Sequence, residues 1–279
     1  MSIALLLGVE DACCIEPSFA DLTDDIWTEH FLQCEATEAR LVVDEHEDPL
    51  ALGLLSGQRW MVGSFLFRPM TIGALQVFEQ TGGEIYQEVR ARWLTAVREY
   101  YANEIMRQVK PAMEDVSPHR YEVINDVVEQ VWGKGHGELC IECCCGSGAG
   151  ASVLRTMGMN PLAYDHDTSL LSLGLHTGRL DPAATMCIDA TVAHRYCERA
   201  PRATVFMLGA IDAFNASMWE QVVASLVSLA DDILLTMGTE QEAIRVGTWG
   251  SKHGCEISID EHTMDPIFDR WICRLKHQP

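Results

Sequence analysis

The chain is 279 residues long, is 48% hydrophobic and 22% charged, and carries 41 acidic residues against 20 basic ones, for a net charge of −21. These values are typical of a globular protein with one large domain or two smaller ones. The excess of acids argues against nucleic acid as a partner, because a phosphate-binding protein needs a surplus of Lys and Arg. No apolar run approaches the roughly 18 residues that a membrane span requires.

The cysteines indicate the compartment. There are 11 of them, and Cys143, Cys144 and Cys145 are consecutive. Adjacent residues of a strand point to opposite faces, so such a run cannot be bridged as a set. The pattern therefore predicts free thiols and a reducing, cytoplasmic location. Cys140 and Cys143 form a single Cys-x-x-Cys pair, and the second pair that usually completes a metal site is missing from the sequence, so no metal is expected.

Residues 1–115 are expected to be a separate, mostly helical region that caps the site, selects the substrate or mediates homodimerisation. Residues 1–9 are apolar but have no basic segment before them, which argues against a secretory signal and favours a short strand. The stretch 81–84 has the spacing of a capping box. Apolar residues then recur at helical spacing over 85–105, which predicts one long amphipathic helix there.

Residues 116–279 are expected to form the second domain, in which strands and helices alternate. Ser117 and Pro118 are residues of the kind that begin a helix. Strands are predicted at 139–143, 162–165, 184–188, 203–208, 232–237, 255–259 and 270–275. Helices are predicted between the first five strands, including one over 191–200, and a short helix opened by a capping box at 239–242 follows the fifth. This order implies an α/β fold with right-handed crossovers and a mostly parallel seven-stranded sheet. The last two strands have no helical pattern between them and are expected to form an antiparallel hairpin at one edge.

The most informative stretch is 139–150, Leu-Cys-Ile-Glu-Cys-Cys-Cys-Gly-Ser-Gly-Ala-Gly, a predicted buried strand that breaks into alternating glycines. Glycine leaves room for a ligand against the backbone and accepts a positive φ. In an open α/β sheet, ligands bind beyond the carboxyl ends of the strands. Asp165 ends the second strand, where an acid suits the hydroxyls of a ribose. Asp189 follows the third strand, where it can meet the amino group of a base. Together the three features predict a nucleotide-type cofactor.

Two cofactors fit these features. The segment from Gly146 to Ala151 satisfies the G-x-G-x-x-G/A pattern, with Asp165 as the ribose acid, which would indicate NAD and an oxidoreductase. Glu142, however, lies near the end of the first strand, where a carboxylate would repel a pyrophosphate. The same carboxylate suits the cationic sulfonium and ammonium groups of S-adenosylmethionine (SAM), which favours SAM.

On these residues the chain resembles the class I SAM-dependent methyltransferases. Their first motif is E/D-x-G-x-G-x-G, and residues 142–148 match it except that Cys144 takes the place of the first glycine. The resemblance covers about residues 118–279 and implies a Rossmann-like fold whose terminal hairpin corresponds to the family's strands seven and six. Asp165 matches the family's ribose acid, with Asp167 as the fallback, and Asp189 with Ala190 matches the pair that flanks adenine. His166 is added because it adjoins Asp165. The expected cofactor contacts are therefore Glu142, Cys144, Gly146, Gly148, Asp165, His166, Asp189 and Ala190.

The family's chemistry implies direct transfer of a methyl group from sulfur to a nucleophile, which depends largely on positioning and on exclusion of water. The acceptor is expected beyond the fourth strand, around residues 208–212. The Asn/Asp-Pro-Pro-Tyr/Phe motif that the family uses for amino nitrogens is missing from the sequence, which argues against methylation of DNA amines or glutamine. The acidic charge balance favours a small molecule or a protein side chain over nucleic acid, and the sequence does not choose between these two. Asp212 and His253 are the candidates for a general base. The cysteine triplet is expected to supply small core side chains at the strand end rather than a reactive thiol. The alternative outside enzymes is a protein of this fold that binds SAM without turnover, as a binding subunit.

Overall fold

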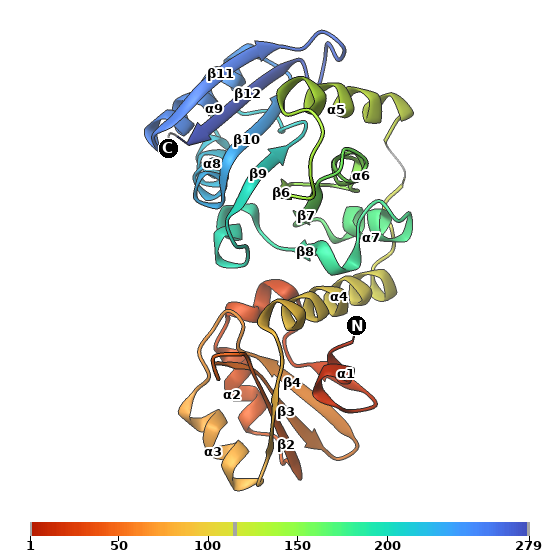
Figure 1. Ribbon diagram of the computed structural model, residues 1–279, viewed down its shortest axis with the longest axis vertical. Coiled ribbons are helices and arrows are strands. Elements are labelled where there is room, and N and C mark those ends of the chain that lie inside the picture. The colour runs from red at the N-terminus through yellow and green to blue at the C-terminus, as the bar shows by residue number, and fades with distance from the viewer. Residues whose placement is uncertain (1, 114–115, 278–279) are drawn as a thin grey trace. The chain divides into compact units, whose positions relative to one another are not determined.

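The computed structural model describes residues 2–113 and 116–277 of the chain. These residues form two compact units, 1–104 and 105–279. The division falls within helix α4 (Arg90–Gln108), upstream of the boundary expected at 115/116. We refer to the two parts as unit 1 and unit 2 and describe each by itself (Figure 1).

Unit 1 is built around a five-stranded sheet with the order β1-β4-β3-β2-β5. Its strands are β1 (Ala12–Cys14), β2 (Glu38–Val43), β3 (Pro49–Ser56), β4 (Arg59–Ser64) and β5 (Glu84–Gln87). Its helices are α1 (Ile3–Leu7), a 3-10 helix over Phe19–Thr23, α2 (Ile26–Leu32), α3 (Ile72–Gln80) and α4. β2, β3 and β4 form an antiparallel meander, and β1 and β5 join its two edges in parallel.

Three expectations for this region are therefore wrong. Unit 1 is not mostly helical, because the apolar runs of β2 and β3 pair with each other and are largely buried. The segment 1–9 holds helix α1 rather than a strand, with Ser2 capping its start and Gly8 in a left-handed conformation at its end. The long helix over 85–105 is also shorter than expected. Residues 84–87 form strand β5 on β2, and the helix begins only at Arg90.

A buried ion pair lies in the core of unit 1. Glu16 and Arg68 are joined by a direct ion pair, and their side chains are 0% and 1% exposed. Glu16 also accepts a hydrogen bond from the Ser64 backbone N–H at 3.0 Å, and Arg68 donates to the Asp24 carbonyl at 3.0 Å. Burial raises the pKa of Glu16, and the Arg68 charge opposes that rise. Burial of both charges is tolerated because each partner compensates the other.

Unit 2 contains a seven-stranded sheet with the order β11-β12-β10-β9-β6-β7-β8. Its strands are β6 (Leu139–Cys143), β7 (Asn160–Asp165), β8 (Thr185–Cys187), β9 (Ala200–Val205), β10 (Ala230–Met237), β11 (Cys255–Glu261) and β12 (Trp271–His277). Its helices are α5 (Pro118–Val131), α6 (Ala149–Thr156), α7 (Thr168–His176), α8 (Ala216–Leu229) and α9 (Glu240–Lys252). Short 3-10 helices cover Pro182–Ala184 and Ala190–Arg195.

The sheet of unit 2 confirms the predicted α/β fold. β8, β7, β6, β9 and β10 are parallel neighbours, whereas β12 runs antiparallel to both β10 and β11. The terminal strands thus form the predicted antiparallel hairpin at one edge. Figure 1 shows α8 and α9 on one side of the sheet and α5, α6 and α7 on the other. One predicted helix is wrong, because 191–200 holds only the short 3-10 helix before β9 begins at Ala200.

Local signals place the helices that frame the carboxyl edge of this sheet. α5 begins with Ser117 as its cap and proline in its first turn, as predicted. α9 has the predicted capping box, in which the Thr239 and Glu242 side chains and backbones bond reciprocally. The apolar face of α5 packs with α6 against the sheet. The buried cluster includes Ile124, Val127, Val128, Leu154, Leu234 and Ile272.

Candidate functional site

The glycine-rich loop leaves β6 in an unusual backbone conformation. Cys144, Gly146 and Gly148 have φ values of 53°, 52° and 80°, all in the left-handed region. Gly148 then caps the start of α6. A left-handed φ costs a residue with a Cβ about 1–2 kcal/mol, whereas glycine adopts it freely. Cys144 therefore occupies a position whose backbone favours glycine, which accords with the glycine found there in the methyltransferase motif.

A cavity of about 250 Å³ opens on this loop at the carboxyl edge of the sheet. Its walls come from α5, from the end of β6 and the loop after it, from the start of α6, and from the residues that follow β7 and β9. The lining residues are Val116, Arg120, Ile124, Glu142, Cys144, Cys145, Gly146, Ser147, Ala149, Gly150, Asp165, Leu170, Phe206 and Met207. Four of the eight expected contacts, Glu142, Cys144, Gly146 and Asp165, thus line one cavity together with residues that the motif did not indicate. Gly148 is not among the lining residues, because Leu180 occupies the space beside its Cα.

Glu142 is the buried acid of this cavity, with 2% of its surface exposed. A Cβ added to Gly150 would lie 2.1 Å from its Oε1, so the carboxylate occupies the space that a side chain at 150 would need. Oε2 is buried, and no described residue shares a hydrogen bond with it. Burial raises the pKa of Glu142 to about 8. The Asp165 charge adds to this rise, whereas the Ala151 N–H and the charges of Arg120 and Arg155 oppose it.

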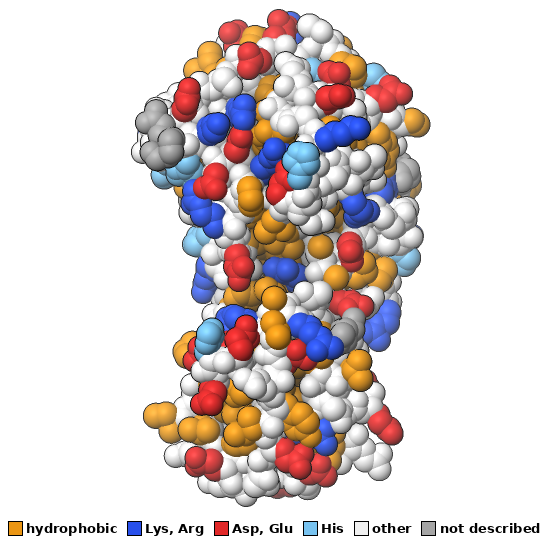
Figure 2. Space-filling view, in the orientation of Figure 1, with side chains coloured by type: hydrophobic (Ala, Val, Ile, Leu, Met, Phe, Trp, Pro, Cys, Tyr) orange, Lys and Arg blue, Asp and Glu red, His pale blue; other side chains and the backbone are white. Residues whose placement is uncertain are grey.

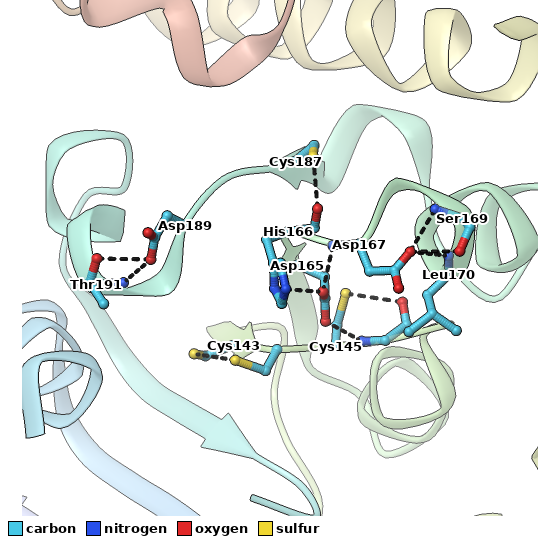
Figure 3. Close-up of polar contacts among 12 residues, drawn as sticks. Cys143, Cys145, Asp165, His166, Asp167, Ser169, Leu170, Cys187, Asp189 and Thr191 are labelled. Atoms are coloured by element: carbon cyan, nitrogen blue, oxygen red, sulfur yellow. Dashed lines mark hydrogen bonds and ion pairs between the residues drawn. The ribbon is translucent and has the colours of Figure 1, made fainter. Parts of the chain in front are cut away.

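Asp165 ties the glycine loop to the end of β7 (Figure 3). Its Oδ2 accepts a hydrogen bond from the Gly146 N–H at 2.8 Å, and its Oδ1 accepts one from the Asp167 N–H at 2.9 Å. Asp167 itself caps α7 by accepting from the Ser169 and Leu170 N–H groups. The carboxylate of Asp165 is therefore fixed in place at the edge of the cavity, as a ligand-binding acid must be.

The other residues expected to contact the cofactor lie outside the described cavity lining. The His166 side chain is 84% exposed, with Nδ1 3.4 Å from Asp165 Oδ1. Asp189 accepts hydrogen bonds from the Thr191 N–H and hydroxyl, both at 2.8 Å. Figure 3 shows Asp189 on a separate loop from Asp165, turned toward Thr191. Asp189 and the adjacent Ala190 thus begin a 3-10 helix in the loop that follows β8.

The two candidates for a general base are placed differently. Asp212 is exposed and closes a turn before α8 by accepting from the Phe214 and Asn215 N–H groups at 2.7 and 3.0 Å. His253 ends α9 and is exposed, just before Cys255, which pairs with His277 at the start of β11. That end of the hairpin adjoins the amino end of β10, so His253 lies at the edge of the sheet opposite the glycine loop. His253 is not among the residues that line the cavity.

The sequence pattern did not predict several of the residues that line the cavity. Arg120, Ile124 and Val116 enter from α5 and the segment before it, and Phe206 and Met207 follow β9. For Phe206 and Met207, the one indication in the sequence was that an acceptor is expected beyond the fourth strand. Nothing in the helical pattern of α5 distinguished Arg120 from a surface residue.

The cysteine triplet forms part of the wall, as expected from its place at the end of a strand. Cys143 and Cys145 are buried, and burial raises the pKa of both thiols, so they are protonated and weakly nucleophilic. Cys144 and Cys145 line the cavity. None of the 11 cysteines, all of which lie among the described residues, forms a disulfide. Within residues 2–113 and 116–277, no group of three or more His, Cys, Asp or Glu side chains has a metal-binding arrangement.

The surface in view mixes both signs of charge. Figure 2 shows acidic side chains scattered over the whole visible face, with Lys and Arg side chains interspersed among them.

No helix among the described residues is long and apolar enough to cross a bilayer.

Comparisons with known proteins find structural likeness. No family model and no curated protein matches the sequence. The chain is similar to the magnesium protoporphyrin IX methyltransferase ChlM from Synechocystis PCC 6803 with bound SAM, at 13% identity over 66% of this chain and 96% of that chain, with a TM-score of 0.44. It is also similar to the N-methyltransferase NodS from Bradyrhizobium japonicum WM9 in complex with S-adenosylhomocysteine (SAH), at 12% identity over 65% and 99%, with a TM-score of 0.45. A TehB-like SAM-dependent methyltransferase from Corynebacterium glutamicum shows 14% identity over 65% and 98%, with a TM-score of 0.43.

Proposed function

We propose that this protein is a SAM-dependent methyltransferase whose cofactor binds in the cavity beside the glycine loop. The observation that carries the proposal is Glu142, a buried residue that lines the cavity and whose Oε2 shares a hydrogen bond with no described residue. A buried and unpaired acid is costly unless a cation compensates it. SAM supplies two cationic groups, its ammonium and its sulfonium.

The same carboxylate argues against the alternative of an NAD-dependent oxidoreductase. In a dinucleotide site the pyrophosphate lies on the glycine loop and at the start of the following helix. Here Glu142 Oε1 occupies the space beside Gly150, in the first turn of α6. A pyrophosphate there would be repelled by the ionised form of Glu142, whereas a cation would favour that form.

The role proposed for each residue follows from its position relative to the cavity. Glu142 would hold the ammonium, and the open backbone at Gly146, where an added Cβ would meet only Leu170 at 4.0 Å, would let the amino-acid part of SAM approach. Asp165, fixed by its two N–H donors, would accept from the ribose hydroxyls. Asp189, Ala190 and His166 would border the adenine, after a rearrangement of their exposed side chains. SAM supplies the activated methyl group when bound, and the chain's part is to orient it and to exclude water.

We propose that the acceptor enters beside Phe206 and Met207, which follow β9 and line the same cavity. It is a small molecule or a protein side chain. Met207 is 47% exposed, so the cavity wall continues to the surface at this point. Cys143 and Cys145 would not serve as nucleophiles, because burial keeps their thiols protonated. Unit 1 is proposed to select the acceptor or to mediate homodimerisation, and the free cysteines favour the cytoplasm.

Calorimetric titration of the full chain with SAM, and separately with NAD, tests the proposed cofactor. We expect SAM to bind and NAD not to bind. Asp165→Ala should weaken SAM binding about 10- to 100-fold, because it removes charge-assisted hydrogen bonds. Asp231→Ala, which removes an exposed acid paired with Arg199, is the matched control and should bind SAM as the wild type does. Binding of NAD in place of SAM, or no effect of Asp165→Ala, would contradict the proposal.

A binding subunit would take up SAM without turning it over. The two cases separate when the protein is incubated with SAM and a cell extract resolved into small-molecule and protein fractions. An enzyme should form SAH with one of the fractions, whereas a binding subunit should form none above the rate without protein.

A further inference from the structure

Arg120 is the half-buried cation of the proposed cofactor cavity. It comes from the first turn of α5, and its side chain is 16% exposed. Burial lowers its pKa, while the charges of Asp265 and Glu142 raise it. An arginine stays protonated under all ordinary conditions. The cavity is therefore lined by one cationic side chain, Arg120, and by two acidic ones, Glu142 and Asp165.

Asp269 holds Arg120 from outside the cavity lining. It belongs to the segment 262–270 between β11 and β12 and is 1% exposed. Its Oδ2 pairs with the Arg120 guanidinium. Its Oδ1 accepts from the Thr236 hydroxyl, at the end of β10, and from the Met207 N–H at 3.1 Å, after β9. The carboxylate is thus anchored to two strand ends before it reaches Arg120.

These contacts leave part of the guanidinium available. A guanidinium has five N–H donors in a planar fork, and one carboxylate engages at most two of them directly. Arg120 Nη1 forms an ion pair with Asp269, whereas the same residue also lines the cavity. Arg120 can therefore bind a second carboxylate from the cavity side without leaving Asp269.

We propose that Arg120, oriented by Asp269, binds the carboxylate of the amino-acid part of SAM, while Glu142 takes its ammonium. This inference rests on the proposed function and deepens it. Asp165 is held by the Gly146 and Asp167 N–H groups, which leaves Glu142 and Arg120 as the acid and the guanidinium for a zwitterion, and an α-amino acid presents its two charges on one carbon. Asp269 is then a positioning residue, because it touches Arg120 and not the ligand.

The arrangement predicts that the protein distinguishes SAM from decarboxylated SAM. The latter keeps the adenosine, the sulfonium and the amine and lacks only the carboxylate. Without that group Arg120 would face the cavity with no anion from the ligand. Loss of one partner of a desolvated charge pair weakens binding about 30-fold or more.

The experiment is a calorimetric titration of the full-length chain with SAM and with decarboxylated SAM, for the wild type and four variants. The wild type should prefer SAM by about 30-fold or more, and Arg120→Gln should bind the two ligands within about threefold of each other. Arg120→Lys should restore part of the preference, because it keeps the charge but loses the planar fork. Asp269→Asn should reduce the preference less than Arg120→Gln does. Arg155→Gln is the matched control, since Arg155 also acts on the Glu142 pKa but is not among the lining residues, and it should keep the full preference.

The outcomes separate this inference from the proposed function. If the wild type binds SAM and decarboxylated SAM alike, or if Arg120→Gln keeps the preference, the inference is overturned while the proposed function stands. If the wild type binds neither ligand, the proposed function itself fails. Thermal unfolding of each variant shows whether it is folded. If Arg120→Gln does not fold, the comparison of Arg120→Lys with the wild type decides, because an unchanged preference in the lysine variant overturns the role of the fork.

Discussion

Each of the two units buries an acid near an arginine, and the two cases differ in what surrounds them. In unit 1, Glu16 and Arg68 are joined directly and are almost completely shielded from solvent. In unit 2, Glu142 and Arg120 line a cavity and are not paired with each other, because the guanidinium of Arg120 is paired with Asp269. Each unit has a buried carboxylate oxygen that shares no hydrogen bond with a described residue, Glu16 Oε2 and Glu142 Oε2, but only Glu142 lies against the cavity. The first pair compensates itself, so it is part of the core. In the proposed function, a ligand compensates the acid of the second case. Burial of charge alone therefore does not indicate a binding site, whereas a buried acid beside a cavity is a candidate for one.

The contrast between the two units is tested most strongly by removing one partner of the Glu16–Arg68 ion pair in unit 1. Arg68→Ala leaves Glu16 as an uncompensated buried charge and should lower the free energy of unfolding of unit 1 by about 3–5 kcal/mol. Urea unfolding followed by circular dichroism measures this loss. SAM affinity of the folded protein should not change, because every lining residue of the cavity belongs to unit 2.

The double variant Glu16→Gln with Arg68→Met is the control for that experiment. It removes both charges and should cost much less than Arg68→Ala. A loss below about 1 kcal/mol for Arg68→Ala would mean that Glu16 finds another partner or reaches water, and the contrast between the units would disappear.

The next largest effect is expected at Gly150. A Cβ there would lie 2.1 Å from Glu142 Oε1 and 2.6 Å from the Phe206 ring. Gly150→Ala should destabilise unit 2 by about 1–3 kcal/mol through overpacking, and SAM binding should weaken because Glu142 is displaced. Gly209→Ala is the matched control. Its Cβ would meet only Trp219 at 3.4 Å, an ordinary contact, so its unfolding curve should stay close to that of the wild type.

The pH dependence of stability sharpens the same comparison. The pKa of Glu142 is about 8 in the folded protein, against about 4.3 in an unfolded chain. Between these values the unfolded state loses the proton and the folded state keeps it. The free energy of unfolding should therefore fall as the pH rises from 5 toward 8 and level off above it. Glu142→Gln should remove this part of the slope, which denaturant titrations at several pH values will show. An identical slope in the variant would mean that a group other than Glu142 titrates in this pH range.

SAM binding should be linked to the same proton. The ammonium of SAM favours the charged carboxylate, so each binding event should release about one proton near pH 7, and affinity should weaken about tenfold per pH unit below 8. Calorimetry in buffers of different ionisation enthalpy counts the protons. In Glu142→Gln the proton release from this group should be lost. Proton uptake by the wild type would exclude Glu142 as the cation-binding group.

The smallest effect is expected from relief of backbone strain. Cys144→Gly removes a Cβ from a residue with φ of 53° and should stabilise unit 2 by about 0.5–1 kcal/mol, after allowance for the greater freedom of glycine in the unfolded chain. Glu47→Gly, at φ 68° in unit 1, should give a gain of similar size. Only the first should change SAM affinity, because Cys144 lines the cavity. Equal effects of both variants on affinity would argue against that role. Thermal unfolding and SAM titration of both variants measure the difference.

The sequence was most informative where the signal is local. The strand predicted at 139–143 coincides with β6, and the capping residues of α5 and α9 lie where their types indicate. The alternation of strands and helices also predicted the parallel sheet, since a crossover between parallel strands has one hand and needs a helix. The glycine motif and Asp165 followed from the same local pattern, because both lie at strand ends.

The sheet of unit 1 could not be predicted in this way. β5 forms on β2 and β1 forms on β4, in each case through backbone hydrogen bonds to a distant segment. The helical spacing of 85–105 began inside β5, because a short segment with a few apolar residues fits both patterns. A partner strand, rather than periodicity, decided its structure.

The sequence by itself determined the fold class of unit 2, the position of the glycine loop and the choice of SAM over NAD as the first cofactor to test. Only the tertiary structure showed that Glu142 is buried and that its Oε2 shares no hydrogen bond with a described residue. It also showed that His253 lies at the amino end of β10, and that Asp269, near the C-terminus of the sequence, pairs with Arg120. The physical reason is that strand order and turns are encoded by neighbouring residues. The pKa of an acid or the direction of a guanidinium depends on groups that come together only when the chain is folded.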